Sequence, residues 1–269
     1  AMGVPLSTAC CCTVGDPDGC VEQLRTGRVV EQQAAAAGIA SIARRKVQRR
    51  SQWMADAVPL LVQAVTRGES MDLREHAARA LANLPMCDAA NAQTIVDAGG
   101  VQALVYLLGV ESYGCRAQAA RALGNMCVVS KAAARKILHG GAVQPLLTAL
   151  LTDEAPIAGI NLSVEAAVAL ANFSSVDTHC RNAVLQSAVV IPGLQHLAAS
   201  EDSQTKAAAR RALLALAQGS MRARQALEAC ESQQLDTARS APSPRSPQRL
   251  EPEVTEKVFG RKSPMVTVR

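Results

Sequence analysis

A short alanine- and leucine-rich segment returns along this chain at nearly constant intervals. Its clearest copies are ARALANL at 78–84 and ARALGNM at 120–126. Weaker copies stand at 36–42, 167–173 and 210–216. The residues at the same place in each copy, here called the pivots, are Ser41, Asn83, Asn125, Asn172 and Ala215. They are separated by 42, 42, 47 and 43 residues, a period typical of a repeat array and not of one globular core.

The composition favours helices throughout. The chain of 269 residues is 49% apolar but only 2% aromatic, so its core must be built from Ala, Leu and Val. Alanine and leucine are strong helix formers, and the alternation of β-branched residues typical of strands is absent. We therefore expect an all-α solenoid of about five to six repeats.

Residues 88–128 illustrate one repeat. The segment DAANAQTIVDAGG predicts a helix that stops at Gly99–Gly100, and VQALVYLLG predicts a second, buried helix. Either Glu111 or Ser112 opens a third helix, which runs through CRAQAARALGNMCV. The longer spacing before Asn172 predicts extra residues in 151–160, where Pro and Gly indicate a surface loop.

This arrangement resembles the armadillo repeat, which has a short first helix, a glycine turn, a buried second helix and a long third helix ending in an A-L-x-N-L-like run. The resemblance covers residues 18–230. It implies a right-handed α-solenoid whose third helices line a concave, peptide-binding groove. We expect residues 1–17 to be a flexible segment and residues 231–269 to be a disordered tail rich in Ser, Pro and Arg.

Each third helix carries a row of polar residues, because positions three, four and seven apart share one helical face. Leu81, Leu84, Leu123 and Met126 fall on the opposite face and are expected in the core. By the resemblance, the asparagine amides of the row hold the main chain of an extended peptide. The candidate groove residues are His76, Arg79, Asn83, Gln118, Arg121, Asn125, Glu165, Asn172 and Arg211.

The residues four positions before each pivot bear on selectivity. Nuclear-import receptors of the armadillo family have tryptophan there, whereas this chain has Ala37, Arg79, Arg121, Val168 and Arg211. Arginine prefers carboxylate or phosphate partners, so we expect an acidic or phosphorylated extended segment. The alternative is that the arginines only solvate the helix face and the asparagines hold adjacent repeats together.

The amino-terminal stretch AMGVPLSTACCC contains an acylation pattern. If the native start is Met2–Gly3, Gly3 is followed at the required spacing by Ser7, which fits N-myristoylation. Cys10, Cys11 and Cys12 are then candidates for palmitoylation, and two lipid signals together anchor a protein stably. The alternative is that Met-Gly is a cloning remnant and the cysteines are incidental.

An armadillo chain with an acylated start resembles the armadillo-repeats-only proteins of apicomplexan parasites that tether rhoptries. This implies a peripheral protein on the cytosolic face of an organelle membrane, which recruits a myosin motor and scaffold proteins. At the other end, Ser-Pro pairs make Ser243, Ser246 and Ser263 candidate phosphorylation sites. The alternative for these serines is an unmodified, solvated tail.

The sequence offers no sign of catalysis. We expect no enzyme activity, no cofactor and no metal, since the histidines lack a nucleophile or ligand spacing and the nine cysteines form no C-x-x-C pair. The net charge of +5 and scarce aromatics disfavour nucleic acid, and no apolar run is long enough for a membrane span. Two rival readings remain: a soluble armadillo scaffold that is a fragment of a larger regulator, and a nuclear-transport receptor.

Overall fold

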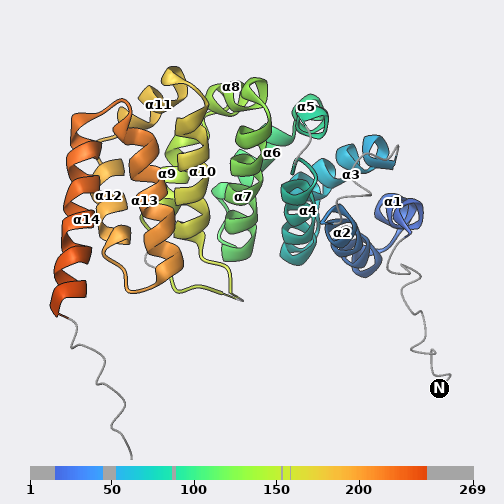
Figure 1. The fold of residues 1–269 in the computed structure, drawn as a ribbon. Helices are drawn as coiled ribbons and strands as arrows, with labels where there is room; N and C mark the ends of the chain where they lie inside the picture. Colours follow the sequence, from blue (N-terminus) through green and yellow to red (C-terminus); the bar gives the residue numbers. More distant parts are fainter. Residues whose placement is uncertain (1–15, 45–52, 87–88, 153, 158, 241–269) are drawn as a thin grey trace, which may run out of the picture. The chain divides into compact units, whose positions relative to one another are not determined.

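The computed structural model describes residues 16–44, 53–86, 89–152, 154–157 and 159–240, and side chains only up to residue 232. The chain divides into two units, residues 1–232 and 233–269. Within the described residues the first unit consists of α-helices, with one isolated β-bridge in a loop (Figure 1). The all-α solenoid predicted from the sequence is confirmed.

The helices repeat in sets of three. The first helices of the sets are α5 (Ala89–Asp97), α8 (Lys131–His139) and α11 (Thr178–Leu185). The second helices are α6 (Gly100–Leu108), α9 (Val143–Leu150) and α12 (Val190–Ala198). The third helices are α4 (Met71–Asn83), α7 (Tyr113–Val129), α10 (Leu162–Val176) and α13 (Ser203–Ala217). Before these sets lie α1 (Pro17–Thr26), α2 (Val29–Ala43) and α3 (Trp53–Arg67), and α14 (Met221–Ser240) follows them.

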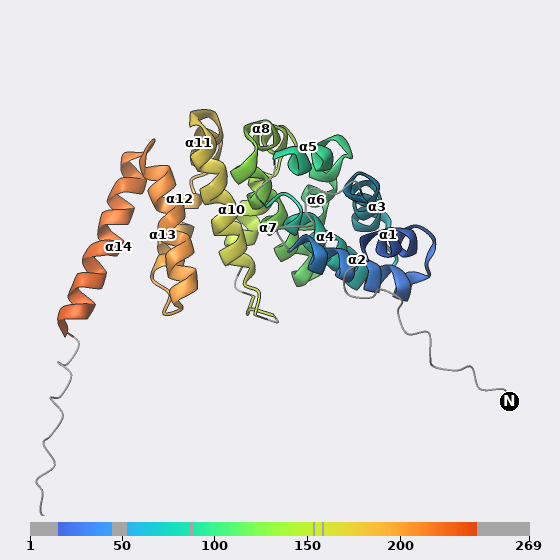
Figure 2. The ribbon, with the colours of Figure 1, turned by 45° about the vertical axis from the view of Figure 1, so that its right-hand side comes forward.

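Helices of one kind stack on each other. The third helices α4, α7, α10 and α13 pack side by side in chain order (Figures 1 and 2). Helix α2 packs on α4 and begins this row, in the position that a third helix would occupy. The second helices α6, α9 and α12 form another row. Each set therefore buries its apolar surface against its neighbours, as a repeat array requires.

Local sequence sets where the helices begin and turn. Side-chain oxygens cap the third helices α4, α7, α10 and α13, and the capping residues are Ser70, Ser112, Asn161 and Asp202. Ser112, and not Glu111, thus opens α7. Gly99 and Gly141 take the left-handed conformation in the turns between first and second helices, with φ of 80° and 76°. The predicted glycine stop is confirmed, although α6 begins at Gly100 itself.

The core consists of aliphatic side chains between the helix rows. The four residues expected opposite the polar row, Leu81, Leu84, Leu123 and Met126, are completely buried. The five cysteines within the described side chains are buried and form no disulfide. Burial raises the pKa of the Cys180 thiol to about 11, so this thiol stays protonated at neutral pH.

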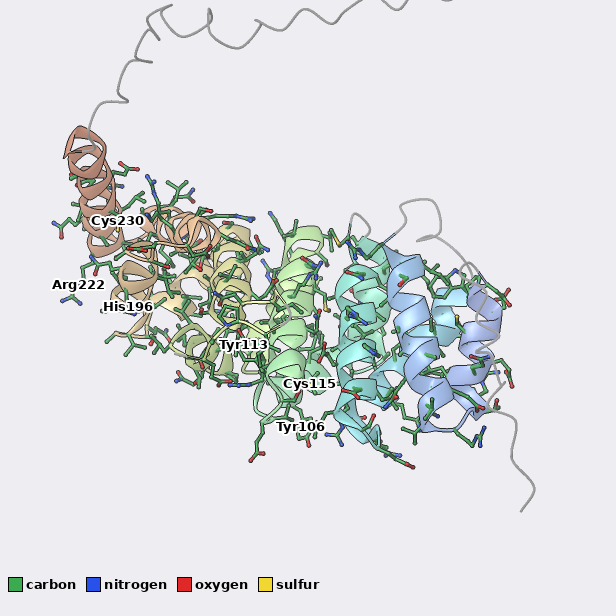
Figure 3. The ribbon with its side chains drawn as sticks, turned by 90° about the horizontal axis from the view of Figure 1, so that it is seen from below. Tyr106, Tyr113, Cys115, His196, Arg222 and Cys230 are labelled. Atoms are coloured by element: carbon green, nitrogen blue, oxygen red, sulfur yellow. The ribbon has the colours of Figure 1, made fainter. Side chains whose placement is uncertain are left out.

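The described residues of 151–160, which are all except 153 and 158, lie in the predicted loop, and contacts with α7 hold them in place. The Tyr113 hydroxyl accepts a bond from the Leu162 amide (2.8 Å) and donates one to the Ile160 carbonyl (3.2 Å). Arg116 forms an ion pair with Glu154 at 2.6 Å. Tyr113 is the first residue of α7, and Figure 3 labels it near Cys115 of the same helix. The inserted residues therefore rest on the preceding repeat.

The ends of the chain are described only in part. Helix α14 runs to Ser240, beyond residue 231, where the sequence predicted the tail to begin. The predicted acylation sites Gly3 and Cys10–Cys12 lie outside the described residues, as do the predicted phosphorylation sites Ser243, Ser246 and Ser263. These predictions, and the predicted domain boundaries, stay predictions.

Candidate binding surface on the third helices

The predicted polar row lies on α4, α7, α10 and α13, one set on each helix. We call the side of these helices that carries the row the third-helix face. Partly or well exposed members are His76, Arg79, Arg121, Asn125, Glu165 and Arg211. Asn83, Gln118 and Asn172 are instead buried, with exposed fractions of 1%, 1% and 7%. The expectation that the whole row faces away from the core is therefore wrong for these three.

The pivot asparagines join successive repeats. Each asparagine donates a hydrogen bond from its Nδ2 to a backbone carbonyl of the preceding helix in the row α2, α4, α7 and α10. The bonds are Asn83 to Ala40 (2.9 Å), Asn125 to Ala82 (2.7 Å) and Asn172 to Gly124 (3.1 Å). In every case the acceptor is the residue just before the previous pivot. The asparagines thus hold adjacent repeats together, as the alternative interpretation proposed, and their Nδ2 groups are already bonded within the chain.

The charged members of the row have polar neighbours. The Arg79 guanidinium lies 2.7 Å from Nδ1 of His76, and burial, followed by the positive charge of Arg79, lowers the pKa of His76. Burial raises the pKa of Glu165, and the nearby Arg121 works against that rise. Arg121 therefore already faces a carboxylate, which weakens its attraction for an acidic partner.

Gln118 is the least expected member of the row. It occupies the position of His76 and Glu165 in the neighbouring repeats but is buried, and neither polar atom of its amide has a hydrogen-bond partner among the described residues. An unpaired buried amide costs roughly 1–3 kcal/mol. Gln118 is thus a strained point of the third-helix face.

A cavity of about 440 Å³ opens where α7 and α10 end and α8 begins. Its lining residues are Cys127, Val128, Val129, Ser130, Lys131, Asn172, Ser175, Val176 and Arg211. Among these described residues the charged ones are Lys131 and Arg211, both basic. Arg211 donates to Oδ1 of Asn172 at 2.5 Å, so its guanidinium is fixed at the cavity. We call this the basic cavity.

The sequence prediction found part of this cavity. Asn172 and Arg211 were predicted, whereas Lys131 and Val128 were missed. Val128 lies three residues beyond the pivot Asn125, so extending the row by one step would have included it. Lys131 belongs to a first helix and carried no such signal.

The last repeat junction has a different donor. Its pivot is Ala215, which has no side-chain amide to donate a hydrogen bond. Instead the buried Arg181 of α11 donates from Nε to the Ala215 carbonyl (3.1 Å) and from Nη2 to Oε1 of Gln218 (2.8 Å). Arg181 thus joins α11 to α13 at a carbonyl that is not the counterpart of those that the asparagines use.

The described part of the chain shows neither a metal-binding cluster nor a membrane-spanning helix. No group of His, Cys, Asp and Glu residues there is arranged to hold a metal ion. None of the helices described is both long and apolar enough to cross a bilayer.

Comparison with known proteins identifies one repeat directly. Residues 88–128 match the family model of the armadillo/β-catenin-like repeat. The sequence predicted three helices of one repeat in these same residues. No curated protein is similar to the chain, so nothing supports the narrower resemblance to rhoptry-tethering proteins.

Three engineered or designed proteins of solved structure are similar to the chain. An engineered protein is 29% identical with a TM-score of 0.72, over 85% of this chain and 90% of that one. A designed armadillo repeat protein in complex with the peptide (KR)4 is 24% identical with a TM-score of 0.69, over 84% and 92%. Computationally designed armadillo repeat proteins for modular peptide recognition give 24% and 0.67, over 80% and 88%.

Proposed function

Because the chain folds as an armadillo-repeat solenoid, we propose that it is a non-enzymatic adaptor that binds an extended, anionic segment of a partner on its third-helix face. A carboxylate or phosphate of that segment is seated in the basic cavity, between Lys131 and Arg211. The segment then runs along the row past Arg121 and Arg79.

The basic cavity is the observation that carries this proposal. It combines two cationic side chains with the amino-terminal end of α8, whose first residue is Lys131 and whose cap is Ser130. The partial positive charge of a helix start adds to the charge of Lys131 and Arg211. Apolar side chains such as Val128 and Val176 complete the wall, which suits an amino-acid side chain better than a free ion.

The asparagines contribute less than the resemblance implied. Each of Asn83, Asn125 and Asn172 spends one N–H of its amide on a neighbouring repeat, and Asn83 and Asn172 are buried, which leaves little of these two amides for a peptide main chain. Binding energy must therefore come mainly from charge and from the cavity. A basic nuclear-import ligand fits poorly, because arginines occupy positions where those receptors carry tryptophan.

Membrane tethering is a further part of the proposal and rests on the sequence alone. Acylation at Gly3 and at Cys10–Cys12 would place the adaptor on the cytosolic face of an organelle, where it recruits partners such as a motor or scaffold. Metabolic labelling with alkyne fatty acids tests this in a chain that starts at Met2. Absence of label would leave the soluble scaffold as the better reading.

Peptide binding can be measured by fluorescence anisotropy. We expect a ten-residue peptide with phosphoserine to bind best, the same peptide with aspartate next, and its serine and lysine versions weakly. Replacing both cations (Lys131→Glu with Arg211→Glu) should weaken binding of the phosphopeptide about tenfold, or about 1.4 kcal/mol.

A matched control separates local contact from net charge. Lys136→Glu with Arg222→Glu changes the net charge by the same amount, but both residues are exposed and lie outside the basic cavity. This control should keep more than half of the wild-type affinity at about 0.15 M salt, because distant charges are screened there. Equal losses in both double variants would contradict a seat at Lys131 and Arg211.

A further inference from the structure

One side of α8 is basic along its whole length. All the basic side chains of this helix are exposed, and they are Lys131, Arg135, Lys136 and His139. Because Lys131, Arg135 and His139 are spaced by four residues, they share one side of the helix, with Lys136 beside them. The buried side consists of Ala133, Ala134 and Ile137. Lys131 also lines the basic cavity, so the cavity and this basic face of α8 are continuous at that residue.

Little neutralises the charge of the basic face. Helix α8 contains no acidic residue, so its cations have no ion-pair partner on their own helix. Among the described residues one ion pair reaches it, between Arg135 and Asp177 at 3.5 Å, and the Arg135 side chain stays 64% exposed. Of the neighbouring first helices, α11 has no acidic residue and α5 has Asp97, which accepts a hydrogen bond from Gln93 of its own helix (2.7 Å). The basic face therefore keeps a net positive charge.

Helix stability explains only part of this pattern. Cations in the last turn of a helix are favourable because the carbonyl end carries partial negative charge, and this accounts for Lys136 and His139. Lys131 is the first residue of α8, where the partial charge is positive and a cation is unfavourable. The basic residue at this position points to a contact outside the helix.

The opposite ends of the third helices carry the opposite charge. The basic cavity lies where α7 and α10 end. Exposed acidic residues stand where α4, α7 and α13 begin, and they are Glu69, Asp72, Glu111, Glu201 and Asp202. An anionic segment that leaves the cavity toward the starts of these helices meets like charges, whereas over α8 it meets cations. Charge therefore favours a path over α8.

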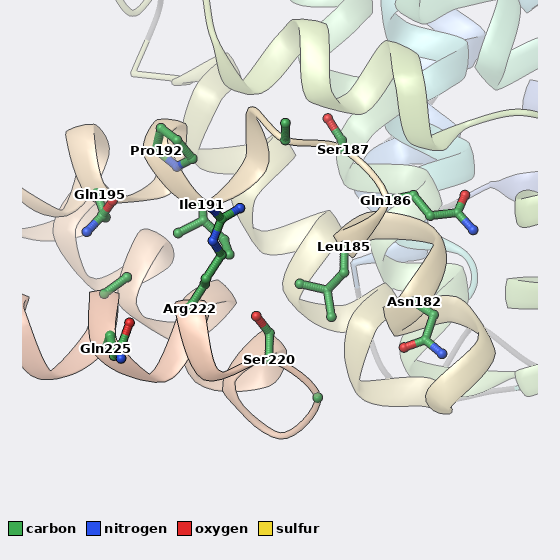
Figure 4. Close-up of a pocket in the computed structure, with 13 residues that line it drawn as sticks. Asn182, Leu185, Gln186, Ser187, Ile191, Pro192, Gln195, Ser220, Arg222 and Gln225 are labelled. Atoms are coloured by element: carbon green, nitrogen blue, oxygen red, sulfur yellow. The ribbon is translucent and has the colours of Figure 1, made fainter.

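A larger cavity beside α11 does not offer the same charge. It has a volume of about 800 Å³ and lies between α11, α12 and the start of α14 (Figure 4). Among the described residues that line it, Arg222 alone is charged, and Figure 4 shows it extending from α14 toward Ile191. Other lining side chains are neutral amides, such as Asn182, Gln186 and Gln225. This cavity suits an acidic segment less well than the basic face of α8.

The length of α8 sets how much of a segment it can hold. From Lys131 to His139 the helix rises about 12 Å, because each residue adds about 1.5 Å. An extended chain covers about 3.3 Å per residue, so about four residues span this distance. Counted from an anionic residue in the basic cavity, the second to fourth residues of the segment therefore lie over Arg135 and Lys136, and later residues pass beyond the end of α8.

We propose that the basic face of α8 binds an acidic arm of the same partner segment, an inference that rests on the function proposed above. The anionic residue of the segment occupies the basic cavity, and the acidic residues on one side of it lie along Arg135 and Lys136. On its other side the segment runs along the third-helix face. The partner is thereby narrowed to a segment with an acidic cluster within four residues of its seated anion.

Fluorescence anisotropy with the full chain and phosphoserine peptides tests this proposal. One peptide is otherwise uncharged, and two others carry three glutamates at positions two to four before or after the phosphoserine. One of these two clusters should raise the affinity about fivefold, and Lys136→Glu should remove most of that gain. The gain from the other cluster should depend on Arg121→Glu instead. When the cluster sensitive to Lys136→Glu is moved to positions six to eight on the same side, its gain should fall below about twofold.

Arg222→Glu is the matched control. It makes the same change of charge on an exposed side chain outside α8 and outside the basic cavity, and it should keep the gain. Lys136→Arg should keep it too, because a cation remains. The otherwise uncharged phosphopeptide should bind Lys136→Glu within about twofold of wild type, since its phosphate lies at Lys131 and Arg211.

The acidic arm and the phosphate seat can fail separately. If Lys136→Glu reduces neither gain more than Arg222→Glu does, or if the displaced cluster gains as much, the arm on α8 is wrong. The seat is judged instead by the otherwise uncharged peptide, and both proposals fail if Lys131→Glu with Arg211→Glu binds it as well as wild type does. An anionic membrane is the rival partner of the basic face. Binding to phosphatidylserine vesicles that Lys136→Glu abolishes, with the peptide gains unchanged, would also overturn the acidic arm.

Discussion

The earlier repeat junctions and the last one solve the same problem with different side chains. Between α2, α4, α7 and α10 a pivot asparagine donates to a carbonyl of the neighbouring helix. At α13 the pivot is Ala215, and two arginines make the contacts to α13 and α10 at other positions. Arg211 donates to the Oδ1 of Asn172, and Arg181 donates to the Ala215 carbonyl.

This difference shows what is fixed and what is free in the array. Each junction carries a side-chain donor that bonds a backbone carbonyl of a neighbouring helix. The identity of the donor varies, and with it the surface charge. The asparagine junctions are neutral, whereas the last junction carries two arginines, of which Arg211 lines the basic cavity.

The largest effect is expected at Gly124, where α7 lies close to α10. A Cβ on Gly124 would lie 2.9 Å from the Cα of Ala169, so Gly124→Val must push α7 and α10 apart and stretch the Asn172 bond. We expect a loss of about 3 kcal/mol in the free energy of unfolding, measured with urea. Gly109→Val, where a Cβ meets only one atom at 3.5 Å, should cost much less. Similar losses would contradict the close approach.

Removing an asparagine that bonds two repeats should lower the free energy of unfolding somewhat less. Asn83→Ala removes the bond to the Ala40 carbonyl at a site that is only 1% exposed, and should lower stability by about 2 kcal/mol. Asn125→Ala should cost about 1 kcal/mol, since Asn125 is only half-buried and water can replace its amide. The reverse order in urea unfolding would show that burial does not decide the strength of the clamps.

Removing the hydrogen bonds of Arg181 should destabilise only the repeats next to it. Arg181→Met keeps the apolar stem but loses the bonds to Ala215 and Gln218, at a cost of about 1.5 kcal/mol. Hydrogen exchange should rise in α13 and the start of α14 while α4 and α7 stay protected, because repeats contact mainly their neighbours. A uniform rise along the array would contradict a local role.

The smallest effect concerns Glu165. Burial raises its pKa, so the folded chain holds this proton more tightly than the unfolded chain does. Stability is therefore lost as pH rises from the ordinary value of 4.5 through the raised pKa. Glu165→Gln removes that loss, and should be slightly more stable than wild type at pH 7 and equal to it below pH 4.5. A less stable variant at pH 7 would mean that the Arg121 pair outweighs burial.

The sequence was informative wherever local periodicity decided the structure. The pivot spacing predicted the helical array, and helical periodicity placed Leu81, Leu84, Leu123 and Met126 in the core. Capping chemistry limited the start of α7 to Glu111 or Ser112. These features depend on residues within one helix or one turn.

It was less informative where two helices meet. The pattern put Asn83, Gln118 and Asn172 on one face, but it could not show how closely the next helix covers that face. Arg181 lies on a first helix and so outside the polar row, which is why the sequence pattern did not predict its bond with Ala215. Lys131 reaches the basic cavity only because α8 begins beside the end of α10. Such contacts between elements are set by packing and not by spacing along the chain.

The central claim is that an anionic peptide lies in the basic cavity, and photocrosslinking from inside that cavity tests it most directly. Val128 lines the cavity and is 62% exposed, so benzoyl-phenylalanine at this position should crosslink a bound phosphopeptide under ultraviolet light. The same probe at Val189, which is 43% exposed and outside the cavity, should not. Crosslinking at Val189, or at neither site while the peptide is bound, would contradict the claim.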